Sequence, residues 1–430
     1  MTKKSDAPAI RFKGFSDAWE QRKFEEVFDC TVPNNTLSRA ELSYDEGTVL
    51  NVHYGDVLIK YGSVLDVQKD DIPRIPHRCR EDFNGALLQD GDVIIADTAE
   101  DETTGKACEI GNLQGSAIVS GLHTMVCRPR NRMALGYLGY YLNSNAYHHQ
   151  LLPLMQGIKV LSLSRSNIQK TSVSYPIAVK EQQLIAYYFS QLDNLITLHQ
   201  RKFEKLTNVK KSMLEKMFPQ NGSSYPEIRF KGFTDPWEQR KLGDISEIKT
   251  GPFGSTLHAD DYVSDGTPII TTEHFKTGAL PRSKNGLPQV SDSDYKRLTA
   301  YTLDDGDIVF SRVGSVDINA LITPFQSNWL FSGRVLRVRP QTNISSQFLH
   351  TRLETESIKT DIRTRAVGQT MPSINTEILK TTPLVLPSSA AEQEQIGSYF
   401  AALDNLITLH QRELEKLQNI KKSMLEKMFV

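Results

Sequence analysis

A segment of 27 residues occurs twice in this 430-residue chain, and it limits the possible folds more than any other feature. The first copy, Leu192–Phe218, and the second, Leu403–Phe429, differ at only four positions. The copies lie 211 residues apart, about half the chain, which indicates a tandem duplication rather than a short-period solenoid. No Pro or Gly interrupts Glu181–Phe218, and Pro219 follows it, so the pattern predicts one unbroken helix roughly 57 Å long.

Apolar residues recur in each copy at alternating spacings of three and four. A seam of this kind makes helices pair along their length. A helix packed only on its own domain would not explain why the two copies remain so alike. We therefore predict that the two helices pack on each other. The predicted interface positions are Leu192, Leu195, His199, Leu206 and Met213 in the first helix and Leu403, Leu406, His410, Leu417 and Met424 in the second.

A second repeat lies before each of the two diverged stretches of the chain. The box Ile10–Lys23 matches Ile228–Lys241 at all but two of 14 positions. The stretches between box and helix read as mixed α/β, with short β-rich runs at Asp92–Ala96, Asp307–Phe310 and Arg334–Val338 and helical runs at Leu135–Asn143 and Gln347–Glu356. The order box, variable domain, helix, repeated once, predicts that the first box lies beside the end of the second helix, near Met428.

We accordingly expect an α/β (α+β) protein with a pseudo-two-fold internal duplication, in which two globular domains are separated by two long antiparallel coiled-coil helices. The expected segments are 1–180 (box and first domain), 181–219 (first helix), 220–391 (linker, box and second domain) and 392–430 (second helix). Residues 221–224, Asn-Gly-Ser-Ser, form the one obvious linker.

Composition narrows the classes of partner and compartment. The formal net charge is −1, so any surface for nucleic acid must be local. The four cysteines (Cys30, Cys79, Cys108 and Cys127) make no C-x-x-C pair and read as reduced thiols. The start of the chain lacks the apolar core of a signal peptide, and no apolar run approaches the roughly 18 residues of a membrane span. We expect a soluble cytoplasmic protein that does not contact membrane.

The sequence contains no motif that would carry chemistry. It has no G-x-x-x-x-G-K-[ST], G-x-G-x-x-G or H-E-x-x-H pattern, and its histidines and cysteines lack zinc spacing. The nearest approach to the N/D-P-P-Y/F tetrapeptide of amino-methyltransferases is Asp235-Pro236-Trp237, which belongs to the repeated box. We therefore expect no catalytic residue, no cofactor-binding residue and no metal site.

The repeated LDNLITLHQR and KKSMLEKMF, together with Glu181–Ile185, Glu392–Ile396 and Trp237–Asp244, resemble the specificity (S) subunit of Type I restriction–modification systems over essentially the whole chain. The resemblance implies a non-catalytic DNA-binding subunit for host defence. Each target recognition domain would read one half of a bipartite, asymmetric site in double-stranded DNA. The implied partners are two methyltransferase (M) subunits and restriction (R) subunits, which would carry S-adenosylmethionine, ATP and Mg²⁺; this chain would need no cofactor.

The resemblance places DNA-facing loops at polar and glycine-rich runs of both domains. In the first domain these supply Lys60, Tyr61, Asp97, Thr98, His123 and Lys159. In the second they supply Lys249, Ser255, Thr256, Thr272, His274, Arg312, Gln369, Thr370, Ser373 and Asn375, and a basic helical run before the last of these loops adds Arg363 and Arg365 to the predicted DNA-binding residues. Arg363 and Arg365, with Lys359, suit phosphates, although a solvated helix face would have the same composition.

Two other functions compete with DNA recognition. A coiled-coil scaffold that joins proteins without binding DNA would share the long helices, and a DNA affinity indifferent to sequence would favour it. A stand-alone methyltransferase is disfavoured by the missing tetrapeptide.

Overall fold

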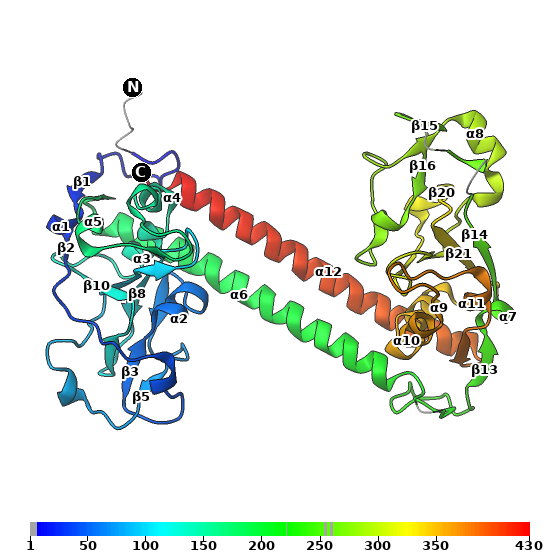
Figure 1. The fold of residues 1–430 in the computed structure, drawn as a ribbon, viewed down its shortest axis with the longest axis horizontal. Coiled ribbons are helices and arrows are strands. Elements are labelled where there is room, and N and C mark those ends of the chain that lie inside the picture. The colour runs from blue at the N-terminus through cyan, green and yellow to red at the C-terminus, as the bar shows by residue number, and fades with distance from the viewer. Residues whose placement is uncertain (1–6, 221, 253–255, 259–260) are drawn as a thin grey trace. The chain divides into compact units, whose positions relative to one another are not determined.

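The computed structural model describes residues 7–220, 222–252, 256–258 and 261–430. Its contacts divide the chain into two compact units (Figure 1): unit 1 comprises Met1–Gln200 with Arg412–Val430, and unit 2 comprises Arg201–Gln411. Both boundaries fall between Gln and Arg of the repeated LHQR. Each unit therefore contains part of each long helix, whereas the segments expected from sequence kept each helix whole.

Unit 1 is a mixed α/β unit with a central sheet ordered β2-β10-β6-β8-β4 and a smaller sheet ordered β5-β3-β9. Neighbours in the larger sheet are antiparallel except for β4 and β8, and β3 is parallel to β9. The strands are β1 (Glu20–Lys23), β2 (Phe28–Asp29), β3 (Val49–Val52), β4 (Val64–Asp66), β5 (Arg74–Ile75), β6 (Val93–Ala96), β7 (Thr98–Ala99), β8 (Ala107–Gly111), β9 (Ala117–Ser120), β10 (Thr124–Pro129), β11 (Leu161–Ser162) and β12 (Ser172–Tyr175). The short helices are α1 (Phe24–Val27), α2 (Tyr54–Ile59), α3 (Tyr137–Leu142), α4 (Asn145–His148) and α5 (Arg165–Ile168).

Unit 2 repeats the centre of this arrangement, because its sheet β14-β21-β18-β19 places β21, β18 and β19 as β10, β6 and β8 are placed in unit 1. Its second sheet, β15-β17-β16-β20, is differently composed. The strands are β13 (Glu238–Lys241), β14 (Ser246–Thr250), β15 (Tyr262–Val263), β16 (Thr267–Ile270), β17 (Gln289–Val290), β18 (Ile308–Ser311), β19 (Asn319–Leu321), β20 (Leu330–Phe331), β21 (Val335–Pro340) and β22 (Pro383–Leu386). The short helices are α7 (Leu242–Ile245), α8 (Asp292–Arg297), α9 (Ser346–Leu353), α10 (Glu356–Arg365) and α11 (Thr376–Lys380).

The two long helices are α6 (Val179–Lys216) and α12 (Ala390–Lys427), each of 38 residues, as the uninterrupted repeat predicts. In unit 1 the start of α6 packs antiparallel on the end of α12: Phe189 stacks on Phe429 with 5.6 Å between ring centroids, and Asp193 pairs with Lys421. Unit 2 contains the equivalent pairing, in which Lys210 contacts Asp404.

The predicted interface positions divide by burial. Leu192, Leu417 and Met424 pack in the core of unit 1, and Leu206, Met213 and Leu403 pack in the core of unit 2. His199 and His410 are half-buried. Leu195 and Leu406 remain 43% and 44% exposed, so they lie at the margin of the seam.

Each box is fixed to the end of a long helix, and the predicted position of the first box is confirmed. The Ile10 N–H donates to the Lys427 carbonyl at 2.9 Å, and the Trp19 ring meets Phe429 edge-on. In unit 2 the Ile228 N–H donates to the Lys216 carbonyl at 2.9 Å.

A Glu-Gln pair near the start of each long helix also contacts the box, and we call this region the junction of box and helix. Glu181 accepts two hydrogen bonds from Arg11, and Glu392 accepts two from Arg229. The neighbouring Gln182 donates to the Pro176 carbonyl and accepts from the Ala134 N–H. Gln393 does the same with the Pro387 carbonyl and the Ser345 N–H. These hydrogen bonds hold the box, the long helix and the domain together. A buried polar group without its partner would lower the stability of the fold.

Candidate nucleic-acid interface and partner grooves

Both units contain a closed seven-residue turn, which we name tip loop 1 (residues 156–162) and tip loop 2 (residues 367–373). In tip loop 1 the backbones of Gln156 and Ser162 exchange hydrogen bonds of 3.0 and 2.8 Å. In tip loop 2 Val367 and Ser373 do the same at 2.9 and 2.8 Å. The two loops are therefore one structural element built twice, although their sequences differ.

A glycine makes each tip loop possible. Gly157 has φ 129° and Gly368 has φ 102°. A Cβ on Gly157 would lie 1.8 Å from the Val160 carbonyl oxygen, and one on Gly368 would lie 2.9 Å from that of Met371. Only glycine fits such a backbone and such an approach.

The tip loops expose apolar side chains. Ile158 is fully exposed and Val160 is 50% exposed in tip loop 1, and Val367 and Met371 are 68% and 66% exposed in tip loop 2. Lys159, Gln369 and Thr370, three of the predicted DNA-facing residues, are exposed on the same loops. Apolar side chains held outward by a closed turn are a feature of binding surfaces, since folding alone does not require their exposure.

Tip loop 1 is fastened to the segment that follows β6. Ser162 pairs with Thr98 in the short β11–β7 ladder, and the Leu163 N–H donates to the Asp97 carbonyl at 2.8 Å. The Asp97 N–H in turn donates to the carbonyl of His123 at 3.1 Å. Four predicted residues, Asp97, Thr98, His123 and Lys159, are thereby brought to one region of unit 1.

The side chains at this region form a small polar cluster. The Thr98 hydroxyl donates to Oδ1 of Asp97 at 2.7 Å, and Nδ1 of His123 lies 3.4 Å from the same oxygen. The His123 ring contacts the edge of Tyr54, 5.3 Å between centroids. His123 also has φ 54°, a left-handed conformation that side chains adopt rarely.

Tip loop 2 is fastened in the same way to the segment that follows β18. Ser373 bridges to Val313, and the Ile374 N–H donates to the Arg312 carbonyl at 2.9 Å. The Arg312 N–H donates to the carbonyl of Arg334 at 2.9 Å, while its guanidinium Nη1 donates to the Gly333 carbonyl at 3.0 Å. The predicted Arg312, Gln369, Thr370 and Ser373 are thus gathered in unit 2.

Other predicted residues of unit 2 lie on separate elements. Asn375 caps α11, where its side chain accepts from the Ile378 N–H. Lys249 donates to the Ala300 carbonyl and lies over the Tyr301 ring. Thr272 and His274 lie in a 3₁₀ turn after β16; Nδ1 of His274 accepts from the Thr271 N–H at 3.1 Å, and burial lowers the pKa of this histidine.

Thr256 is half-buried, and its carbonyl accepts from Arg297. Ser255 lies outside the described residues.

In unit 1, Lys60 and Tyr61 follow α2. Lys60 pairs with Asp71 at 2.9 Å and lies over the Tyr44 ring. Tyr61 is only 3% exposed and packs in a hydrophobic cluster, and burial raises its pKa. Its position in the core argues against the predicted DNA contact.

The basic run at the end of α10 is occupied by intramolecular ion pairs. Lys359 pairs with Glu354 at 3.2 Å, and Arg363 pairs with both Asp317 and Glu356. Arg365 pairs with Asp361 and donates to Thr382 Oγ1 at 2.6 Å. These contacts give the run a structural role and reduce its local positive charge, so the phosphate contacts predicted from sequence remain predictions.

Sequence reasoning missed Arg334, which is exposed and occupies in unit 2 the place of His123 in unit 1. A signal was present, because β10 and β21 both end in Arg-Pro, at Arg128-Pro129 and Arg339-Pro340. Counting back from these pairs aligns His123 with Arg334.

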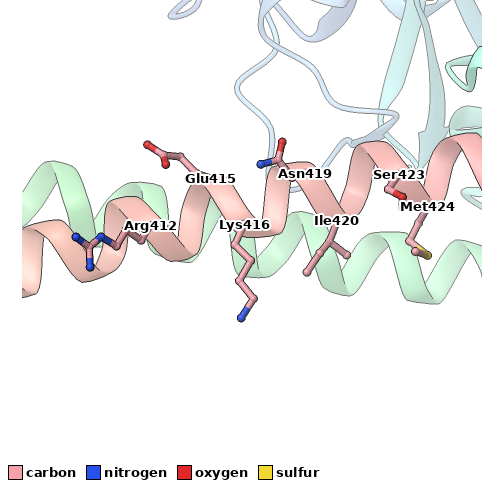
Figure 2. A pocket seen from close by; sticks show the side chains of 7 residues that line it. All are labelled: Arg412, Glu415, Lys416, Asn419, Ile420, Ser423 and Met424. Carbon is pink, nitrogen blue, oxygen red and sulfur yellow. The ribbon is translucent and has the colours of Figure 1, made fainter. Parts of the chain in front are cut away.

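A second candidate surface lies on the long helices themselves. Figure 2 shows side chains that follow one another along α12 and line an open groove of about 530 Å³. A groove of about 500 Å³ lies on α6 at the equivalent residues. The lining residues are Arg412, Glu415, Lys416, Asn419, Ile420, Ser423 and Met424 on α12, and Arg201, Glu204, Lys205, Asn208, Val209, Ser212 and Met213 on α6. We call these the α12 groove and the α6 groove; they differ only by Ile420 against Val209.

Within residues 7–220, 222–252, 256–258 and 261–430 no cluster of three His, Cys, Asp or Glu side chains could hold a metal ion. None of the helices in those same ranges has the length and apolar character needed to cross a membrane.

The chain consists of two α/β units that share a central sheet and nearly identical long helices but differ in their loops. Comparison with known proteins identifies the family that has this architecture. The model of the Type I restriction modification DNA specificity domain matches residues 16–208 and again residues 234–419. The chain therefore belongs to this family and carries two recognition domains.

Its relatives include specificity subunits from Methanocaldococcus jannaschii. The type I restriction enzyme MjaVIII specificity subunit is 24% identical over 256 residues, 57% of this chain, and the match spans 59% of that relative. The putative type I restriction enzyme MjaX specificity subunit is 23% identical over 423 residues, covering 95% of this chain and 92% of the relative. The crystal structure of a Type I restriction–modification S subunit from M. genitalium has the same fold, with a TM-score of 0.65, 12% identity and 99% coverage of both chains.

Proposed function

We propose that this chain is the DNA sequence-recognition subunit of a Type I restriction–modification complex. Unit 1 and unit 2 each read one half of a bipartite, asymmetric site in double-stranded DNA, and the long helices hold methyltransferase and restriction subunits. The chain itself is non-catalytic and cytoplasmic. S-adenosylmethionine, ATP and Mg²⁺ belong to the partner subunits.

One observation carries this proposal: the closed tip loops and their attachments are built alike in both units, but the side chains they present differ. Asp97, Thr98 and His123 in unit 1 correspond to Arg312, Val313 and Arg334 in unit 2. A shared backbone frame with unlike side chains suits two readers of different base sequences, because base edges are distinguished by hydrogen-bond donors and acceptors.

The α12 and α6 grooves support a scaffold for two copies of one partner. Their surfaces present the same polar residues, Arg, Glu, Lys, Asn and Ser, in the same order. Most of these side chains are not buried, so packing within this chain does not explain why both copies keep them. Two like grooves accept two like subunits, which fits a pair of methyltransferase subunits.

Methylome mapping tests the proposal. The chain is co-expressed with its methyltransferase partner in a host without other adenine methylation, and modified bases are located genome-wide. We expect one split, asymmetric motif, and we expect the purified chain alone to methylate and cleave nothing. Methylation or cleavage by the chain alone, or methylation without sequence preference, would contradict the proposal.

Partner stoichiometry tests the scaffold separately. Charge reversal at one groove, Arg412→Glu or Arg201→Glu, should remove one of two bound methyltransferase subunits, and the double variant should remove both. Mass measurement of the purified complexes distinguishes these cases. Arg240→Glu, on the exposed strand β13, is the control and should leave two subunits bound.

A further inference from the structure

Arg352, on α9 of unit 2, is a buried cation without an acidic partner. The residue is 4% exposed, and its Nε is enclosed without a hydrogen-bond partner. Among the described residues its guanidinium makes one hydrogen bond, from Nη1 to Oγ1 of Thr355 at 3.3 Å. Arg337, also buried in this unit, instead pairs with Glu247 at 2.9 Å. Burial lowers the pKa of Arg352 to about 10, and a buried charge without a counter-ion costs stability.

The position that Arg352 occupies has an equivalent in unit 1. The N–H groups of Ala134 and Ser345 donate to the glutamines of the two junctions, at 2.9 and 3.0 Å, so these two residues correspond. Seven residues further on lie Tyr141 in unit 1 and Arg352 in unit 2.

Unit 1 shows that the fold does not require a charge there. The rings of Tyr141 and Phe429 lie 5.7 Å apart, and Cζ of Arg352 lies 5.4 Å from the ring of Phe218, so both side chains contact the phenylalanine after a long helix. The Tyr141 hydroxyl accepts from the Ser174 N–H at 2.8 Å and is thereby satisfied inside its unit. The guanidinium in unit 2 needs a different explanation.

Arg352 lines a cavity of about 290 Å³ in unit 2. Exposed Gln220 and Ser223 line it too, so the cavity connects the surface with the buried guanidinium. Asp361 is the acidic residue among the described residues of its lining, and it pairs with Arg365. The charge left uncompensated at this cavity is therefore positive.

The first turn of α10 adds backbone donors to the same cavity, because Ser357, its second residue, lines it. Thr355 is the N-cap, but its side chain does not cap the helix; its hydroxyl donates to the Arg352 carbonyl at 2.7 Å. Glu356, the acid of this turn, pairs with Arg363. The N–H groups at the start of a helix carry partial positive charge and bind phosphate, as a guanidinium fork also does.

We propose that this cavity binds a small phosphate-type oxyanion, with Arg352 as its counter-ion and the start of α10 as a second group of donors. The cavity lies at the small end of ligand pockets, which span about 300–1,000 Å³. It therefore suits inorganic phosphate or the phosphate end of a nucleotide. A phosphate of duplex DNA is excluded, because Arg352 is buried and a duplex stays at the protein surface. Phosphate binding here is separate from DNA recognition.

Calorimetric titration of inorganic phosphate into the full chain, at constant ionic strength in chloride, measures the binding. We expect a single site. Arg352→Tyr gives unit 2 the residue that unit 1 has at this position, and it should weaken binding by about 10- to 150-fold, as loss of a charged hydrogen-bond partner does. Arg282→Tyr removes the same charge from an exposed position and should bind phosphate like the wild type.

Thermal unfolding shows whether the variant is folded and whether phosphate acts at this site. Without phosphate, Arg352→Tyr should melt no lower than the wild type, because the uncompensated charge is gone. Phosphate at about a hundred times its dissociation constant should raise the Tm of wild-type unit 2 by about 5–10 °C and leave that of the variant unchanged. A measurement without substitution is hydrogen exchange of the Ser357 amide, which phosphate should slow in the wild type.

Competing ligands identify the source of the anion. Adenosine 5′-monophosphate that binds more tightly than inorganic phosphate would identify a nucleotide, and equal or weaker binding would identify the free ion; either result supports the site. Equal binding of acetate, an equal Tm shift in Arg352→Tyr, displacement of phosphate by a short DNA duplex, or no binding at all would overturn it. None of these results would alter the methylation motif, so the proposed function is tested independently.

Discussion

The junctions between box and long helix are built alike in the two units. In contrast, the position directly after β6 in unit 1 is Asp97, and the position directly after β18 in unit 2 is Arg312, so the two carry opposite charges. The Arg11–Glu181 and Arg229–Glu392 contacts have the same pair of distances, 2.7 and 2.8 Å, and each glutamate is 1% exposed. A buried charge needs its partner, because leaving it unpaired costs several kcal/mol, roughly 3–5 by the usual range. A half-exposed loop side chain has no such constraint. The comparison shows that buried ion pairs constrain both copies to the same residues, whereas partly exposed loop positions can differ between the copies.

The junctions still differ in one detail. In unit 2 the indole N–H of Trp237 donates to Glu392 at 3.2 Å. In unit 1 the equivalent indole nitrogen of Trp19 is buried and has no hydrogen-bond partner among the described residues. The junction of unit 2 therefore has one more hydrogen bond to its carboxylate.

The interiors of the two units also differ at one equivalent strand position. Glu109 lies on β8 opposite Val93, where unit 2 has Leu321 opposite Ile308. Glu109 accepts from the Gly139 N–H at 2.8 Å. A Cβ on Gly139 would lie 2.0 Å from the Ser63 carbonyl oxygen, so no larger residue fits there. Unit 2 instead has the apolar Leu321 at this strand position.

The largest expected effect is loss of the aromatic anchors at the helix ends. Phe429 contacts the rings of Trp19 and Phe189 in unit 1, and Phe218 contacts those of Trp237 and Phe400 in unit 2. Phe429→Ala and Phe218→Ala should each lower the free energy of unfolding by about 3–5 kcal/mol. Denaturant titration measures the loss, and hydrogen exchange should locate it in unit 1 for the first variant and in unit 2 for the second. A loss spread equally over both units would contradict the equivalence of the anchors.

Next in size is the buried ion pair at each junction. Arg11→Ala and Arg229→Ala should each destabilise by about 3 kcal/mol, the lower end of the range for buried pairs, since each guanidinium partly reaches solvent. Adding Glu181→Gln to the first variant, or Glu392→Gln to the second, should recover part of the loss, because the uncompensated charge is then absent. Additive losses in these double variants would show that the pairs act independently of charge.

A pH effect of about 3 kcal/mol should distinguish unit 1 from unit 2. Burial raises the pKa of Glu109 from 4.5 to about 7. Between these values the native state binds the proton more tightly than the unfolded chain does. The contribution of Glu109 to the free energy of unfolding should therefore be greatest below pH 4.5, fall as the pH rises to about 7, and stay level above it.

Hydrogen exchange of β8 at pH 5 and pH 8 measures this dependence. Glu109→Gln should flatten it, because an amide does not titrate, and β19 of unit 2, with Leu321, provides the internal control. An unchanged slope in the variant would assign the pH dependence to another group.

The smallest effect concerns the margin of the helix seam. Leu195→Ala and Leu406→Ala should cost less than about 1 kcal/mol, because their side chains are already 43% and 44% exposed. The buried neighbours give a matched contrast, since Leu192→Ala and Leu403→Ala should cost about 2–5 kcal/mol. Equal losses at the two kinds of position would mean that the seam is wider than described.

The long helices and the duplicated frame could be predicted from sequence because their signals are local and repeated. An uninterrupted apolar periodicity predicts a helix without knowledge of its partner. The order of boxes and helices predicted the closure at Met428. The Arg–Glu junctions could not be predicted, because they join Arg11 to Glu181 across most of a domain.

The candidate interface was only partly predictable. Glycine-rich and polar runs pointed to the tip loops, whose closure depends on glycine at positive φ. Burial was not visible in sequence: Tyr61 follows a polar lysine yet packs in the core. The Asp317 partner of Arg363 was likewise hidden, because it comes from a segment distant in sequence. Sequence alone did not show that Asp97 and Arg312 occupy equivalent positions. That equivalence became apparent only from the backbone hydrogen bonds of both units.

The division of unit 1 between two stretches of chain has a consequence for synthesis on the ribosome. Unit 2 is one continuous run, Arg201–Gln411, and every residue that it needs has been translated before Arg412 appears. Unit 1 is made first but lacks the helix end that carries Phe429 until the last twenty or so residues of this sequence emerge. The portion translated earliest is therefore completed latest. During that interval the rings of Trp19 and Phe189 are without the Phe429 ring that contacts them in the folded unit, so we expect this half of the nascent chain to expose apolar surface for longer.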